Sequence, residues 1–134
     1  MLETRLGLAS LWLGPDEWLL IAPEPDDKRL LQTITGALVG IPHALVDVSH
    51  REAELVVSGH LRRRVLNAGC PLDLYDRAFP IGMCTRTVIA KAQVVLWRPD
   101  EDSFRLHVAR SFVGYLASLL GEVARGWQAA NALR

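Results

Sequence analysis

The 134-residue sequence has few cysteines, no long apolar run and no excess of either charge. Its two cysteines are too few for the disulfide framework of a small secreted domain, so we expect a reducing cytoplasm as its location. No apolar run approaches the roughly 20 residues of a membrane-spanning helix, and no membrane association is expected. The 15 basic and 15 acidic residues cancel, which argues against nucleic-acid binding through counterion release. Zero net charge suits a protein whose partner is another protein.

Apolar residues make up half of the chain. A domain of this size buries about two thirds of its unfolded surface and needs no disulfide or metal to fold. No repeat, low-complexity segment or linker divides the sequence. We therefore expect a single domain, residues 1–134.

Hydrophobic periodicity predicts an alternation of strands and helices. Strands are expected at residues 6–13, 18–22, 44–48, 54–58, 84–92, 93–98 and 104–108. Helices are expected from Asp26 to Leu38, over residues 61–66 and over residues 112–127. Gly69 is expected to cap the C-terminal end of the helix at 61–66, and Ser111 is expected to be the N-cap of the helix at 112–127. This order predicts an α+β fold with a mostly antiparallel sheet, a ferredoxin-like βαββαβ core and a C-terminal amphipathic helix.

Residues that could carry chemistry are widely spaced. The four histidines and two cysteines include no close-spaced pair, so no metal site is expected. No glycine-rich loop precedes a predicted helix, which excludes the common phosphate-binding loops.

Asp47, Ser49 and His50 are the residue types of a hydrolytic triad. On an extended strand, however, Asp47 and Ser49 share one face and His50 points to the other, so we interpret them as turn residues. Cys70 would follow the negative end of a helix, where a packed cysteine is more probable than a nucleophile. We expect no catalytic, cofactor-binding or metal-binding residue in this chain.

The four tryptophans divide into two predicted classes. Trp18 and Trp127 lie on apolar elements and are expected in the core. Trp12 precedes a turn and Trp97 stands beside Arg98, so these three residues are expected at a partner interface, where Trp and Arg dominate binding energy.

Arg62 and Arg63 are further interface candidates, because residues 62–64 turn around the wetter side of a short predicted helix. Such a run is usually a solvated face. The alternative is that it grips an anionic ligand.

Four segments resemble, in the same order, the gamma subunit of heterotetrameric sarcosine oxidase. They are WLGPDEWLL (12–20), VDVSHREAELVVSGHLRRRVLNAGCPLDL (46–74), FPIGMCTRTVIAKAQVVLWR (79–98) and FRLHVARSFVGYLASLL (104–120). They span nearly the whole chain, and the pieces GCPLDL, CTRT and RSF are fairly specific. More distantly, DVSH followed by VSG resembles the folate-binding domain of the glycine-cleavage aminomethyltransferase, whose α+β fold agrees with the predicted element order.

The resemblance implies a noncatalytic accessory subunit of a complex that oxidatively demethylates sarcosine to glycine. In that family the larger flavoprotein subunits carry FAD, FMN, NAD and the tetrahydrofolate site, and the gamma subunit binds none of them. The acidic, Asn-rich stretch with which the aminomethyltransferase holds folate has no counterpart between residues 79 and 98. The chain is shorter at its N-terminus than many gamma subunits, so we expect a trimmed or divergent member.

Three alternatives stay open at this point. One is the small subunit of N-methylglutamate dehydrogenase, because the substrate pocket would lie in another chain. A second is a free-standing folate-binding or one-carbon-transfer domain, in which residues 62–64 would pair with a glutamate tail. The third is a homo-oligomer unrelated to amine oxidation, and self-association of the isolated chain is also compatible with the first interpretation.

Overall fold

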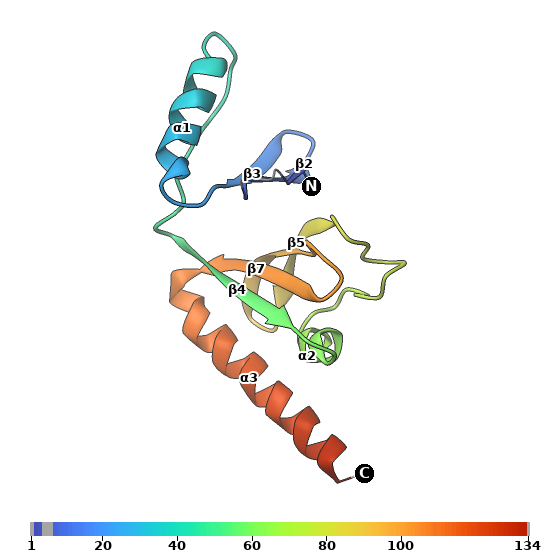
Figure 1. The fold of residues 1–134 in the computed structure, drawn as a ribbon. Helices are drawn as coiled ribbons and strands as arrows, with labels where there is room; N and C mark the ends of the chain where they lie inside the picture. Colours follow the sequence, from blue (N-terminus) through green and yellow to red (C-terminus); the bar gives the residue numbers. More distant parts are fainter. Residues whose placement is uncertain (1, 4–6, 134) are drawn as a thin grey trace. The chain divides into compact units, whose positions relative to one another are not determined.

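The computed structural model describes residues 2–3 and 7–133 and divides into two compact units (Figure 1). Unit 1 is Met1–Val48 and unit 2 is Ser49–Arg134. The expectation of one domain, residues 1–134, stays a prediction, because a division by contacts does not measure whether the two units unfold together.

Unit 1 consists of a three-stranded antiparallel sheet followed by a helix, drawn in blue and cyan in Figure 1. Its elements are β1 (Leu2–Glu3), β2 (Ala9–Gly14), β3 (Glu17–Ile21) and α1 (Asp26–Ala37), and the sheet order is β1-β2-β3. Pro15 and Asp16 form the turn between β2 and β3, as expected for these residue types. Two acidic residues in the first turn of α1 favour its start. The strands predicted at residues 6–13 and 18–22 and the helix predicted from Asp26 to Leu38 are confirmed with shifted ends, although residue 6 lies outside the described residues.

The strand predicted at residues 44–48 is wrong, since residues 42–48 are irregular. It was expected to form a hairpin with β4 (Glu52–Ser58), but β4 is the first strand of the order β4-β7-β6-β5, and its partner among the described strands is β7 (Ser103–Ala109). Furthermore, β3 and β4 belong to different sheets. The ferredoxin-like βαββαβ core is therefore not observed, whereas the α+β class with antiparallel sheets and a C-terminal helix is confirmed.

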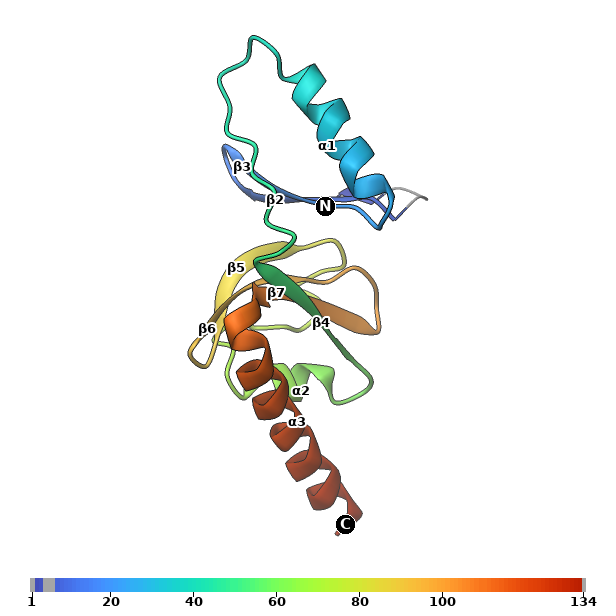
Figure 2. The same cartoon turned by 90° about the vertical axis from the view of Figure 1, so that its left-hand side faces the viewer.

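Unit 2 is a four-stranded antiparallel sheet in the order β4-β7-β6-β5, with two helices. Its remaining elements are α2 (Arg62–Asn67), β5 (Cys84–Ile89), β6 (Ala92–Trp97) and α3 (Arg110–Ala132). Figure 2 shows α2 and α3 side by side next to this sheet. Alternate residues of the central strands point to the helices and form the core with them. The buried core comprises Val65, Leu66, Cys70, Leu74, Phe79, Ile89, Ala92, Val94, Leu96, Phe104, Leu106, Val108, Leu116 and Leu120.

The C-terminal helix α3 is longer than the sequence pattern predicts and has 23 residues. It begins directly after β7 with Ala109 as N-cap and without a side-chain capping bond, so the prediction of Ser111 as N-cap is wrong. Only Leu116 and Leu120 are buried, and every described residue after Ala124 is exposed. The last turns of α3 therefore make no use of the core of unit 2 (Figures 1 and 2).

Gly69 follows α2 where the sequence predicts a helix end. Its carbonyl oxygen accepts a hydrogen bond from the Ala90 amide at 3.0 Å, which ties the end of α2 to the β5–β6 turn. A Cβ atom on Gly69 would lie 2.9 Å from the Ala90 nitrogen and 3.2 Å from Ile89 Cγ2. The close approach of two backbone segments, and not a left-handed cap, is the reason for glycine here.

We expect Gly69→Ala to lower the free energy of unfolding by about 1–3 kcal/mol, because the backbone at Ala90 must move. Gly114→Ala in α3 is the matched control, since nothing lies within 4 Å of its added Cβ. Alanine is the better helix former, so this control should leave stability unchanged or raise it by up to about 1 kcal/mol. Urea denaturation measures both; equal effects of the two variants would contradict the close-approach argument.

Candidate functional site

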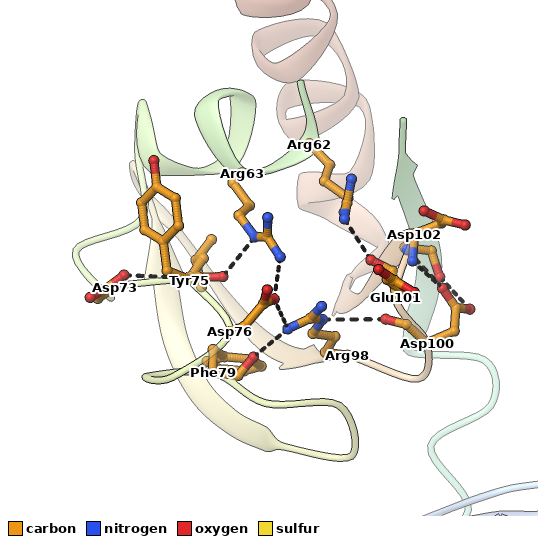
Figure 3. Close-up of polar contacts among 12 residues, drawn as sticks. Arg62, Arg63, Asp73, Tyr75, Asp76, Phe79, Arg98, Asp100, Glu101 and Asp102 are labelled. Carbon is orange, nitrogen blue, oxygen red and sulfur yellow. Dashed lines mark hydrogen bonds and ion pairs between the residues drawn. The ribbon is translucent and has the colours of Figure 1, made fainter. Parts of the chain in front are cut away.

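Arg62, Arg63 and Arg98 are three of the five predicted interface residues and lie near one another in unit 2 (Figure 3). Arg63 and Arg98 contact loop 70–83, and Arg62 contacts the β6–β7 turn. Arg62 and Arg63 begin α2, and Arg98 directly follows β6. We refer to these three residues as the arginine cluster. Of the other two predicted interface residues, Trp12 lies on β2 in unit 1, and Trp97 is the last residue of β6, directly before Arg98.

Asp76 in loop 70–83 binds two members of the arginine cluster. Its Oδ1 atom is 2.7 Å from Arg98 Nη1 and also accepts a hydrogen bond from Arg63 Nη2. The hydrogen bond from Arg98, together with the positive charges of Arg63 and Arg98, holds the pKa of Asp76 below its ordinary value. This carboxylate therefore stays ionised and links α2 to the end of β6.

Arg98 is 2% exposed, so its predicted place on a partner surface is wrong. Its Nη1 also donates to the Phe79 carbonyl at 2.9 Å, and its Nε donates to the Asp100 carbonyl at 3.3 Å. The guanidinium lies 5.8 Å from the centre of the Phe104 ring. A buried cation needs such partners because desolvation is costly. No local pattern could indicate this role, since Asp76 and Phe79 are distant in the sequence.

Arg62 and Arg63 also donate to carbonyl groups of the chain. Arg62 bonds the Gly59 carbonyl at 2.8 Å and the Glu101 carbonyl at 2.6 Å, and Arg63 Nε bonds the Leu74 carbonyl at 3.1 Å. These contacts cross-link loops within unit 2. They do not favour an anion-gripping patch, and a contact of Arg62 and Arg63 with a partner stays a prediction.

Trp97 is 1% exposed, which contradicts its predicted surface position. Trp97 ends β6, which lies between β7 and β5, and five of the six residues of this strand are buried. The Arg105 guanidinium lies 5.3 Å from the centre of the Trp97 ring, a cation–π geometry. The prediction that Trp97 is exposed relied on its sequence neighbour Arg98. A charged sequence neighbour does not show what packs over a strand.

Trp12 and Trp18 are directly opposite each other on β2 and β3. Trp12 is 58% exposed and Trp18 is 56% exposed. The exposure of Trp12 is as expected, but the predicted core position of Trp18 is wrong, because Trp18 lies on the same exposed face of the hairpin as Trp12. Trp127, also predicted in the core, is exposed on α3, and the Arg64 guanidinium lies 5.1 Å from the centre of its ring.

A row of side chains crosses the four strands of unit 2 at one level. Arg86, Val95, His107 and Glu54 are successive cross-strand partners on β5, β6, β7 and β4. A hollow of about 420 Å³ opens along this row. It is lined by Glu52, Arg86, Thr87, Val88, Gln93, Val94, Val95, His107 and Ala109.

His107 is the titratable group of interest in this hollow. Its Nε2 atom is 3.4 Å from Glu54 Oε2. Burial lowers the pKa of His107 below 6.5, and the charges of Glu54 and Glu52 oppose this shift only in part. The imidazole is therefore neutral at neutral pH, and no serine, cysteine or second histidine lines the hollow beside it.

The remaining residue types with catalytic potential occupy structural positions. Ser49 and His50 lie in the turn before β4, as predicted, and Asp47 precedes it. Cys70 is buried, as expected, and Cys84 is partly buried; the two residues form no disulfide with each other. Among the described residues, no three His, Cys, Asp or Glu side chains are arranged to hold a metal ion. Within residues 7–133, no helix combines the length and hydropathy that a membrane crossing needs.

Comparison with known proteins gives one consistent result. The sequence profile of the sarcosine oxidase, gamma subunit family matches residues 3–125. The sarcosine oxidase subunit gamma of Corynebacterium sp. strain U-96 is 37% identical over 125 residues, which cover 93% of this chain and 60% of that protein. The subunit of the same name from Arthrobacter sp. is 42% identical over 98 residues, covering 73% of this chain and 47% of that protein.

A solved structure agrees with these sequence matches. One chain of the heterotetrameric sarcosine oxidase from Corynebacterium sp. U-96, in complex with pyrrole 2-carboxylate, is similar with a TM-score of 0.81 and 36% identity. The match covers 90% of this chain and 61% of that chain. This protein thus spans about 60% of the length of the Corynebacterium relatives that it matches.

We expect Arg98→Lys to lower the free energy of unfolding by about 1–3 kcal/mol, because an ammonium cannot reproduce the guanidinium's contacts with Asp76, Phe79 and Asp100. Arg77→Lys is the matched control, because Arg77 is exposed in loop 70–83, the loop that Arg98 contacts. This control should change stability by less than about 0.5 kcal/mol. Denaturant titration monitored by circular dichroism measures both. A tolerated lysine at position 98 would show that the buried network is dispensable.

Stability should also depend on pH through His107. Because its pKa is lowered from 6.5 in the folded chain, the unfolded chain binds a proton more readily, and the free energy of unfolding falls as pH drops below about 6.5. His107→Asn should make this fall shallower between pH 7 and pH 5. His60→Asn, at an exposed position, should retain the wild-type slope. Parallel slopes for all three proteins would contradict the burial argument.

Proposed function

This chain belongs to the sarcosine oxidase gamma subunit family, and we propose that it is a noncatalytic accessory subunit of a flavin-dependent heterotetrameric sarcosine oxidase. The complex would oxidatively demethylate sarcosine to glycine in the cytoplasm. Its larger flavoprotein subunits would carry FAD, FMN, NAD and tetrahydrofolate. The observation that carries the proposal is the similarity of nine-tenths of this chain to a chain of such a heterotetramer.

The contacts of the arginine cluster and of His107 with groups of their own chain support an accessory role. Arg63 and Arg98 bind Asp76, and Arg62 binds backbone carbonyls. These contacts stabilise loops of unit 2. His107 lies beside a carboxylate in a hollow whose lining includes neither serine nor cysteine. A subunit of this kind contributes surfaces to a complex, and the reacting groups belong to its partners.

A free-standing folate-binding domain is less well supported. That function would use residues 62–64 to pair with the glutamate tail of the ligand. Arg62 and Arg63 are instead engaged with carbonyl groups and with Asp76, and Arg64 lies over the Trp127 ring. Releasing Arg63 for a ligand would cost its contacts with Leu74 and Asp76 in loop 70–83, and releasing Arg62 would cost its bonds to the Gly59 and Glu101 carbonyls.

The proposal is tested by co-expressing the full chain with the oxidase subunits encoded beside it in its own genome. We expect the chain to co-elute with a large flavoprotein, and the purified complex to consume oxygen with sarcosine. Failure of the chain to join any flavoprotein would overturn the proposal. Oxidation of N-methylglutamate in preference to sarcosine would instead assign the chain to the small subunit of that dehydrogenase.

Calorimetry of the isolated chain with tetrahydrofolate provides the complementary test. We expect no binding heat at micromolar protein. Tight one-to-one binding would show that this chain holds the folate itself and would overturn the assignment of the cofactor to a partner subunit.

A further inference from the structure

One face of the β2–β3 hairpin in unit 1 leaves large apolar side chains in solvent. Trp12 and Trp18 are directly opposite each other, and Ser10 and Leu20 are the next pair on the same face, because side chains of a strand alternate between faces. We call these four residues the tryptophan face. Its three large side chains are exposed to 58%, 56% and 38% for Trp12, Trp18 and Leu20. They therefore form a contiguous patch and not scattered apolar residues.

Unit 1 shields little of its apolar surface. Among its described side chains, only Ala9 and Leu11 are buried, and α1 has no buried residue. Each tryptophan has roughly 150–250 Å² available for burial, so the tryptophan face exposes an apolar area on the order of a few hundred Å². Soluble monomers rarely expose larger contiguous apolar patches, and the largest patch is often functional. Tryptophan at the centre of such a patch is the residue type that most often dominates an interface.

The charges of unit 1 indicate what kind of surface covers this patch. Residues 1–48 contain seven acidic and three basic side chains, whereas residues 49–134 contain eight acidic and twelve basic side chains. Unit 1 is therefore acidic although the net charge of the whole chain is zero. Asp16 and Glu17 lie at the turn that joins the two strands of the tryptophan face. A complementary surface has an apolar centre to accept the two indoles and basic side chains at its border.

We propose that the tryptophan face is the docking surface of this chain for a larger subunit of the oxidase complex, on a region that is apolar and bordered by Lys and Arg. This inference rests on the proposed function, because it takes the occupant to be a subunit of that complex. The two tryptophans supply the binding energy through burial. The acidic turn orients the contact and makes it sensitive to salt.

The test uses the full chain, co-expressed with the oxidase subunits of its own genome. Trp12→Ser/Trp18→Ser should weaken assembly by at least about 30-fold, as measured by the concentration at which the complex dissociates in size-exclusion chromatography. Because both side chains are exposed, the isolated variant should keep the circular dichroism spectrum and unfolding midpoint of the wild type. Trp127→Ser, at an exposed position on α3, is the matched control and should assemble normally.

The electrostatic part has a separate measurement. Asp16→Lys should weaken assembly several-fold at low salt, and this difference should shrink as the salt concentration rises. It involves no apolar side chain, so it tests the docking surface even where the double tryptophan variant fails to fold. If Asp16→Lys leaves the concentration at which the complex dissociates unchanged at low salt, the proposal that Lys and Arg border the partner surface is overturned.

The outcomes separate the two proposals. A wild-type chain that does not assemble overturns the proposed function. A wild-type chain that assembles, with Trp12→Ser/Trp18→Ser and Trp127→Ser assembling equally well, overturns the docking surface alone. A double variant that abolishes only self-association of the isolated chain, without loss of the oxidase complex, shows that a second copy is the occupant and also overturns the docking proposal.

Discussion

The arrangement of unit 2 depends on the hydrogen bonds and the ion pair of the buried Arg98 guanidinium. A cation that is 2% exposed is tolerated only where its hydrogen bonds are satisfied. Here the partners come from the Asp76 carboxylate, the Phe79 carbonyl and the Asp100 carbonyl, which belong to loop 70–83 and to the β6–β7 turn. One side chain therefore holds a long loop and a turn against the end of β6. Asp76 extends the network to Arg63 at the start of α2.

The contacts of Arg62, Arg63 and Arg98 explain why the arginine cluster does not form an obvious ligand site. Each member of the arginine cluster donates to atoms of its own chain, so the charges stabilise irregular segments that contribute no regular backbone pairing. Several large apolar side chains are exposed as well, notably Trp12 and Trp18 in unit 1 and Trp127 on α3. Internal polar networks and exposed apolar surfaces are the expected division in a subunit that works inside a larger assembly.

The elements that local patterns predict well are those whose partners are close in sequence. The β5–β6 hairpin, α1 and α3 follow from alternation and helical spacing, and the structure contains each with shifted ends. The prediction of a strand at residues 44–48 was wrong because it assumed a hairpin with β4. The strand that pairs with β4 is β7, which lies about 50 residues later in the sequence. Among the candidate interface residues, the exposure of Trp12 was predictable from its turn, whereas the burial of Trp97 and Arg98 was not.

The amino-acid sequence by itself determined the α+β class, the absence of close-spaced metal-ligand motifs and the family resemblance, because these depend on local periodicity, spacing and motif order. Only the tertiary structure decided which faces of the strands are covered. Trp97 on β6 is buried, whereas Trp18 on β3 and its cross-strand neighbour Trp12 on β2 are exposed, although Trp97 and Trp18 both lie in apolar runs. The physical reason is that exposure depends on what packs over a strand, and in unit 2 those neighbours come from segments far apart in the chain.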